Sequence, residues 1–149
     1  MLQNTNYQRN IIVNQSSSDI LRALTYDIDM WWANLDSSPE AVGDIFKISF
    51  GGESYWKFMI KEISETHLIW KCVESNQDHN LKGIDEEWLN TEIEWRILEH
   101  PNETEIQFTH HGLVPDAICY EVCSNGWDFY ILKSFQSYLD SGKGLPLGK

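Results

Sequence analysis

The feature that most constrains the fold is a change in hydrophobic period along the chain. Between residues 45 and 111, large apolar residues recur at every second position in five short segments. The inward set defined by this alternation is Phe46, Ile48, Phe50, Trp56, Phe58, Ile60, Leu68, Trp70, Cys72, Ile93, Trp95, Ile97, Ile106, Phe108 and His110. Such alternation is typical of antiparallel strands with one buried and one solvated face. The middle of the chain is therefore predicted to form an antiparallel sheet, whose first hairpin turns at Gly51 and Gly52.

The flanking segments predict one strand before this sheet and helices on both sides of it. Residues 7–13 are expected to form a first strand, and Ser16 with Asp19 matches a helix N-cap. Apolar residues at helical spacing run from Pro115 to about Leu139, where Gly and Pro residues end the pattern. The order predicts an α+β fold: a curved antiparallel sheet of about six strands wrapped on a long C-terminal helix, with short helices after the first strand.

The chain length predicts a single domain. A chain of 149 residues is long enough to bury a core without disulfides or metals. We expect residues 1–6 to be a loose N-terminus, residues 7–140 to form the domain, and residues 141–149 to be a C-terminal tail. No internal repeat or second domain boundary is apparent.

Charge and cysteine content exclude several classes of partner. The net charge of −12 argues against a phosphate-tracking nucleic-acid binder and against docking on anionic lipid. Three cysteines in a chain of this size form no disulfide framework. The chain shows no signal peptide and no apolar run of membrane-spanning length, so a cytoplasmic protein is expected.

The inner face of the sheet and the facing side of the helix raise the question of a cavity. Bulky rings on the strands would face small residues on the helix, an arrangement that leaves room for a ligand. The alternative is that the rings interlock and fill the core. The candidate cavity wall consists of Trp32, Phe46, Trp56, Phe58, Trp70, Trp95, Phe108, His110, Cys119, Cys123, Trp127 and Tyr130.

Two other stretches are expected to differ in burial. Of the adjacent Trp31 and Trp32, one ring should close the core while the other lies near a cavity mouth. The polar stretch 74–90 is expected to be a solvated connector. Gly126 is expected to let the long helix approach the sheet closely, and His111 should point to solvent and titrate without consequence.

The segments DILRALTYDIDMWW, IFKISFGGESYWKF and, above all, FTHHGLVPDAICYEVCSNGWDFYILKSFQSYLDSGKG resemble a known superfamily. It is the SRPBCC superfamily of StAR-related lipid-transfer, polyketide-cyclase and Bet v-like domains. The chain is most similar to its bacterial branch related to the activator of the heat-shock-protein-90 ATPase. The resemblance implies a helix-grip fold with a cavity between helix and sheet, and no particular reaction. The position after His110, often acidic in that branch, is His111 here.

Metal binding and nucleophilic catalysis are two less favoured hypotheses for the role of His110, Cys119 and Cys123. The two thiols lie four residues apart and can face the same space as the imidazole. A zinc site would need a fourth ligand that is not visible, and a nucleophile would need an oxyanion donor. We therefore expect no metal, no cofactor and no catalytic residue, with the cysteines acting as small buried wall residues.

Three classes of function remain. The first is a binding module for a small apolar or amphipathic ligand. The second is a chaperone-associated interaction protein, as the resemblance suggests. The third, less favoured, is a cyclase- or hydrolase-type enzyme that uses His110 or Tyr130 as acid or base.

Overall fold

The computed structural model describes residues 6–49, 54–76, 88–115 and 120–146. Seven antiparallel strands form one sheet in the spatial order β1-β7-β6-β5-β4-β3-β2. The strands are β1 (Tyr7–Val13), β2 (Asn34–Leu35), β3 (Ile45–Ser49), β4 (Tyr55–Ile63), β5 (His67–Asn76), β6 (Glu92–Glu99) and β7 (Thr104–His111). The helices are α1 (Ser17–Ala23), the short 3₁₀ helix η2 (Ile28–Met30), α3 (Tyr120–Trp127), the π-helix η3 (Asp128–Phe135) and α4 (Gln136–Ser141).

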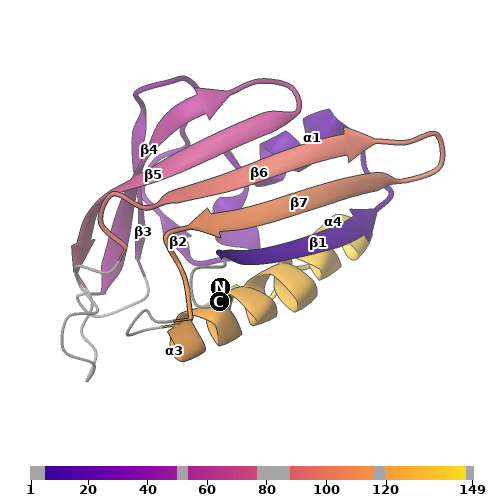
Figure 1. Ribbon diagram of the computed structural model, residues 1–149. Helices are drawn as coiled ribbons and strands as arrows, with labels where there is room; N and C mark the ends of the chain where they lie inside the picture. The colour runs from indigo at the N-terminus through magenta and orange to yellow at the C-terminus, as the bar shows by residue number, and fades with distance from the viewer. Residues whose placement is uncertain (1–5, 50–53, 77–87, 116–119, 147–149) are drawn as a thin grey trace.

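The predicted α+β arrangement is confirmed. The consecutive segments α3, η3 and α4 form one long C-terminal helix that runs along a face of the sheet, with α4 against β1 (Figure 1). The seventh strand, β2, was not predicted because two residues are too few to show a period. Cys119 and the turn at Gly51 and Gly52 lie outside the described residues, although β3 and β4 do pair antiparallel.

Local signals explain the ends of the helices. Ser16 caps α1, because its hydroxyl accepts a hydrogen bond from the backbone N–H of Asp19 at 3.3 Å. The C-terminal helix ends at Ser141, and Gly142 follows it in the left-handed conformation at φ 81°. The backbone N–H of Gly142 donates to the carbonyl of Tyr138, which is the usual way in which glycine terminates a helix.

The sheet curves because β4 and β5 do not pair in one continuous register. The register shifts between Lys57 and Phe58 and again between Ile60 and Glu62. Irregularities of this kind bend a strand and increase its local twist. The bend gives the sheet a concave inner side toward the C-terminal helix.

The π-helical segment changes which residues of the long helix face the sheet. The buried apolar side chains of its described part are Cys123, Trp127, Ile131, Phe135 and Leu139, spaced four apart. An ordinary α-helical phase predicted Tyr130 on this face, but it is only partly buried. A π-helix closes i→i+5 hydrogen bonds and turns less per residue, so a four-residue spacing stays on one side.

The glycine that allows close backbone packing in the C-terminal region is Gly144, and not Gly126 as expected. A Cβ atom added at Gly126 would meet nothing within 4 Å. At Gly144 it would lie 2.9 Å from the Cα of Trp31, so this glycine lets the chain after the helix pack on that tryptophan. The hydroxyl of Ser134 completes the contact, because it donates to the Trp31 carbonyl at 2.5 Å and accepts from the N–H of Leu145 at 2.7 Å.

Candidate functional site: an aromatic cluster between sheet and helix

All seven tryptophans of the chain lie in one connected cluster of rings between the sheet and the C-terminal helix. We call this group, together with the phenylalanines that contact it, the aromatic cluster. Its members are Trp31, Trp32, Phe46, Trp56, Phe58, Trp70, Trp88, Trp95, Phe108, Trp127 and Phe135. Trp56 is partly buried and the other members are at most 3% exposed. The aromatic side chains of the strands and of the helix therefore pack together in one cluster between the sheet and the helix.

Most residues of the predicted cavity wall come together in this cluster. Trp32, Phe46, Phe58, Trp70, Trp95, Phe108, His110, Cys123 and Trp127 are buried, and Trp56 and Tyr130 pack against them. The two surface pockets described below share no lining residue with this set. Whether the set lines a cavity stays a prediction, since Cys119 and its neighbours lie outside the described residues.

The adjacent tryptophans both face inward, contrary to expectation. Trp31 is 0% exposed and Trp32 is 2% exposed. Their rings stack with centroids 5.8 Å apart and planes 11° apart. The expectation assumed a regular element, in which neighbouring side chains diverge. These residues instead follow η2 in an irregular turn, and the Trp31 N–H donates to the carbonyl of Ala23 at 2.7 Å.

Trp88, like Phe135, is a member of the aromatic cluster that was not predicted from the sequence. It belongs to the stretch expected to be a solvated connector, yet it is 3% exposed. Its ring stacks on Trp56 at 3.8 Å, with planes 7° apart, and lies nearly parallel to Trp127 at 5.6 Å. The one signal for its burial was the residue type, since a tryptophan in a polar stretch rarely stays in water.

His110 connects the helix to the turn before β6 through a chain of hydrogen bonds. The Trp127 N–H donates to His110 Nδ1 at 3.1 Å, which places the imidazole proton on Nε2. Nε2 lies 2.9 Å from the Thr91 hydroxyl, which in turn donates to the Trp88 carbonyl at 2.6 Å. Both ring nitrogens are therefore engaged within the protein.

The electrostatics of His110 follow from its burial. The side chain is fully buried, and desolvation, with a smaller contribution from His111, lowers its pKa to about 3. A charged imidazolium could not accept the Trp127 N–H, so the neutral form also suits the hydrogen bonds. This arrangement is that of a satisfied core histidine and does not support the expected acid–base or nucleophile-activating alternatives.

Tyr130 and Cys123 give no further support to catalysis. Burial raises the pKa of the Tyr130 hydroxyl, which makes it a poorer proton donor. Cys123 is buried and free of disulfides, as is Cys72. Within the described part of the chain, no three His, Cys, Asp or Glu side chains are arranged to hold a metal ion.

Three indole N–H groups of the aromatic cluster have no hydrogen-bond partner. Among the described residues, the N–H groups of Trp70, Trp88 and Trp95 are buried and meet no acceptor. Buried donors in proteins are normally paired, and an unpaired one costs about 1–3 kcal/mol. The interior therefore offers unused donors inside an otherwise apolar, ring-lined space.

The outer face of the sheet carries a separate polar cluster. Glu94 is 8% exposed, and its carboxylate lies 2.7 Å from Nε2 of His111, 2.5 Å from Nε2 of His67 and 2.8 Å from Nη2 of Arg96. His111 thus points outward as expected, and its Nε2 pairs there with the Glu94 carboxylate. This cluster lies on the opposite face from His110, because adjacent strand residues alternate.

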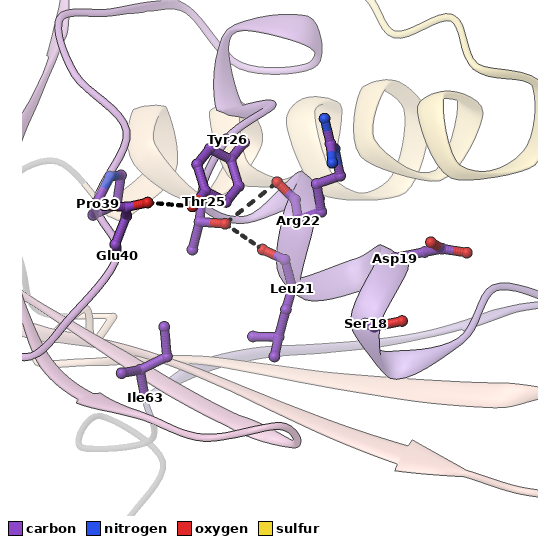
Figure 2. A pocket seen from close by; sticks show the side chains of 9 residues that line it. All are labelled: Ser18, Asp19, Leu21, Arg22, Thr25, Tyr26, Pro39, Glu40 and Ile63. Atoms are coloured by element: carbon purple, nitrogen blue, oxygen red, sulfur yellow. Dashed lines mark hydrogen bonds between the residues drawn. The ribbon is translucent and has the colours of Figure 1, made fainter.

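The surface pockets are separate from the aromatic cluster. The larger, of about 400 Å³, is open to solvent and lies between α1 and the segments that carry Glu40 and Ile63 (Figure 2). Its polar groups are largely paired with one another, as in the hydrogen bond from the Tyr26 hydroxyl to Glu40 at 2.5 Å. This surface pocket offers no arrangement of reactive groups.

A curved antiparallel sheet closed over one long C-terminal helix is a helix-grip fold, as the sequence resemblance implied. Solved structures confirm the resemblance at the level of the fold. The solution structure of the Aha1 dimer from Colwellia psychrerythraea matches with a TM-score of 0.76 and 24% identity, over 94% of this chain and 99% of that one. The protein SSP2350 from Staphylococcus saprophyticus matches with a TM-score of 0.71 and 14% identity, over 96% and 99%.

A third similar structure is larger than this chain. DynU16, described as a putative protein in the dynemicin biosynthetic locus, matches with a TM-score of 0.70 and 12% identity. The match covers 93% of this chain and 48% of that one. No protein-family model matches the chain, and no curated protein sequence matches it. No helix in the described ranges combines the length and apolarity needed to cross a membrane.

Proposed function

We propose that this protein binds a small amphipathic molecule, with a flat apolar body and at least one hydrogen-bond acceptor, between the sheet and the C-terminal helix. The observation that carries the proposal is the set of three buried indole N–H groups, on Trp70, Trp88 and Trp95, that meet no acceptor among the described residues. Edge-on contacts to neighbouring ring faces offset only part of that deficit.

The chemistry of the ligand follows from the surroundings of these donors. Indole N–H groups only donate, so the complementary group is a carbonyl, carboxylate, ether or phenolic oxygen. The rest of the site is aromatic, which favours an apolar and preferably aromatic body. Small-molecule sites commonly combine apolar walls with a few orienting polar groups in this way. No step of a reaction is assigned, because both nitrogens of His110 are already engaged.

The test compares ligands and donors in matched pairs. Native mass spectrometry and ligand-observed NMR would be run with naphthol, naphthoate and their hydrocarbon parent naphthalene, and with flavone and a fatty acid. Trp95→Phe and Trp70→Phe keep a ring but remove the N–H, so each should weaken an acceptor-bearing ligand more than its hydrocarbon parent. Trp31→Phe is the control, since its N–H already donates to the Ala23 carbonyl. Absence of saturable binding across the panel would refute the proposal.

A second candidate is a chaperone-associated interaction protein. Its support is a pair of exposed apolar side chains, Phe129 (39% exposed) and Leu132 (40%), on the solvent side of the C-terminal helix. Such residues mark protein contacts when they gather in a patch. We expect Phe129→Ser with Leu132→Ser to abolish any stimulation of a heat-shock-protein-90 ATPase by this chain. If the unmodified chain neither binds nor stimulates that ATPase, this candidate is removed.

A further inference from the structure

The ring of Trp88 lies nearly parallel to two other indoles. Its centroid is 3.8 Å from that of Trp56 with planes 7° apart, and 5.6 Å from that of Trp127 with planes 12° apart. His110 meets the ring edge-to-face at 4.5 Å and 84°. We call this space, bounded by Trp56, Trp127 and His110, the indole slot. Its shape is that of one planar ring system.

The two indoles that flank the indole slot lie on regular secondary structure, whereas Trp88, whose ring fills it, lies in a turn. Trp56 lies on β4 and Trp127 at the end of α3, and the Trp127 N–H is fixed by its hydrogen bond to His110. Trp88 lies in the turn before β6, and its side-chain N–H meets no acceptor in the described part of the chain. Stacking and burial alone therefore hold its ring.

The turn that carries Trp88 is anchored independently of the ring. The Trp88 carbonyl accepts from both the backbone N–H and the hydroxyl of Thr91, at 3.0 Å and 2.6 Å. Asn90 adopts a left-handed conformation at φ 68°, and its N–H donates to the carbonyl of Cys72. Rotation of the Trp88 side chain would leave these backbone contacts in place.

We propose that the indole slot is the binding site for a planar aromatic ligand and that Trp88 is its internal occupant, which leaves when the ligand enters. This inference rests on the proposed function and adds the location, the flatness of the ligand and the residue that competes with it. One stacked ring replaces another, so the contacts with both walls are conserved and no void is left.

The geometry also predicts what the indole slot rejects. Walls that each lie within 12° of the Trp88 ring plane accept a flat ring system but not a puckered one of the same carbon count. Competition with Trp88 should weaken every ligand of the unmodified chain, since the free protein must first expel its own ring. Removing Trp88 should therefore strengthen binding of flat probes.

The first experiment uses indole and its saturated analogue octahydroindole as probes. Trp88→Ala should bind indole at least about tenfold more tightly than the unmodified chain does, with a saturable rise in Tm. Octahydroindole should show no such gain. Trp88→Leu, which refills the indole slot with a side chain that is not flat, is the matched variant and should bind indole less well than Trp88→Ala. Equal gains for both probes, or no gain for either, would overturn the inference.

A second measurement does not depend on the folding of a variant. The unmodified chain labelled with fluorotryptophan would be titrated with naphthol, and the Trp88 fluorine resonance followed. Its movement to a solvent-exposed position supports the inference. Saturable naphthol binding with the Trp88 resonance unmoved overturns it, while leaving the proposed function standing. Indole binding by Trp88→Ala without any ligand for the unmodified chain supports the indole slot but counts against the proposed function.

Discussion

At the residue scale, His110 shows how a reactive side chain becomes a structural one. Its Nδ1 accepts from Trp127 and its Nε2 lies within hydrogen-bond distance of Thr91, so the imidazole links β7 to the long helix and to the turn before β6. Those partners are 17 and 19 residues away in sequence. A buried group with every hydrogen bond made contributes to stability and to a unique core, not to proton transfer.

Replacing His110 should therefore weaken the fold. His110→Phe keeps an aromatic ring but leaves the Trp127 N–H without an acceptor, so we expect a loss of about 1–3 kcal/mol in the free energy of unfolding, measured in urea. Thr91→Val, which removes only the hydroxyl partner, should lose less. An unchanged unfolding midpoint in His110→Phe would contradict the hydrogen-bond chain.

The same residue predicts a pH dependence of stability. The pKa of His110 is lowered to about 3 in the folded protein, whereas the unfolded chain takes up this proton near about 6.5. Stability is then fully present above about pH 6.5 and falls as the pH drops, because only the unfolded state binds the proton. The difference between the unmodified chain and His110→Phe should therefore shrink between about pH 7 and pH 5. A constant difference across this window would be inconsistent with a neutral buried imidazole.

Glu94 is the second residue with a definite electrostatic role. Burial acts to raise the pKa of its carboxyl, but hydrogen bonds from His111 and His67 and the charge of Arg96 outweigh burial and lower it. Its contribution to stability is therefore present above the ordinary carboxyl pKa and lost as the pH falls through the lowered folded value.

We expect Glu94→Gln to destabilise the protein by about 1–2 kcal/mol at pH 7, and by progressively less as the pH falls below about 4. Glu92→Gln, on the same strand and paired with Lys61, is the control and should change stability by no more than about 0.5 kcal/mol. Denaturant unfolding at several pH values measures both. Equal effects of the two substitutions would contradict the special position of Glu94.

At the scale of elements, the long helix shows how an irregularity sets a buried face. The segment η3 keeps Trp127, Ile131 and Phe135 on the sheet side at four-residue spacing. Its first residue, Asp128, also binds β1, because its carboxylate accepts from the Tyr7 hydroxyl and from Arg9 Nε at 2.8 Å. The helix is thus fixed to the sheet by packing along one side and by a polar contact at the junction of α3 and η3.

Two glycines of this region should respond to alanine in opposite directions. Gly126→Ala adds a methyl group that meets nothing within 4 Å, so helix propensity should stabilise the fold by about 0.5–1 kcal/mol. Gly144→Ala would place a Cβ at 2.9 Å from the Trp31 Cα and should destabilise it. Thermal unfolding of both variants provides the comparison. A destabilised Gly126→Ala would mean that this face of the helix is not open.

At the scale of the whole molecule, the aromatic cluster joins most elements of the fold. It takes rings from the segment after α1, from five of the seven strands, from the turn before β6 and from the long helix. A single shared core predicts that these parts unfold together. Tryptophan fluorescence and far-ultraviolet circular dichroism should therefore report one urea transition with the same midpoint. Two separate midpoints would show that the sheet and the helix are independently stable.

Much of the fold could be predicted from the sequence, because strand alternation and helix-end residues are local patterns. Alternation placed Phe46, Phe58 and Phe108 on the inner face, and all three are buried. The Ser16 cap and the glycine after the helix set element ends that the structure reproduces. The strand β2 escaped prediction because pairing with β3, not its own pattern, makes it a strand.

The composition of the site was harder to predict. The inward rings were foreseen, but the burial of Trp88 and the inward turn of both Trp31 and Trp32 were not. Each of these depends on irregular backbone, for which no period applies. Tyr130 was placed one step off the buried face because the π-helical phase of η3 leaves no mark in residue spacing.

The sequence by itself determined the sheet, the long helix and the side of each strand that is buried, since backbone geometry repeats every two residues or every turn. Only the tertiary structure decided that Trp88 stacks with both Trp56 and Trp127, and that both nitrogens of His110 are engaged. These contacts join residues far apart in the chain. They exist because a close-packed interior fixes which side chains meet, and hydrophobic pattern alone does not encode that choice.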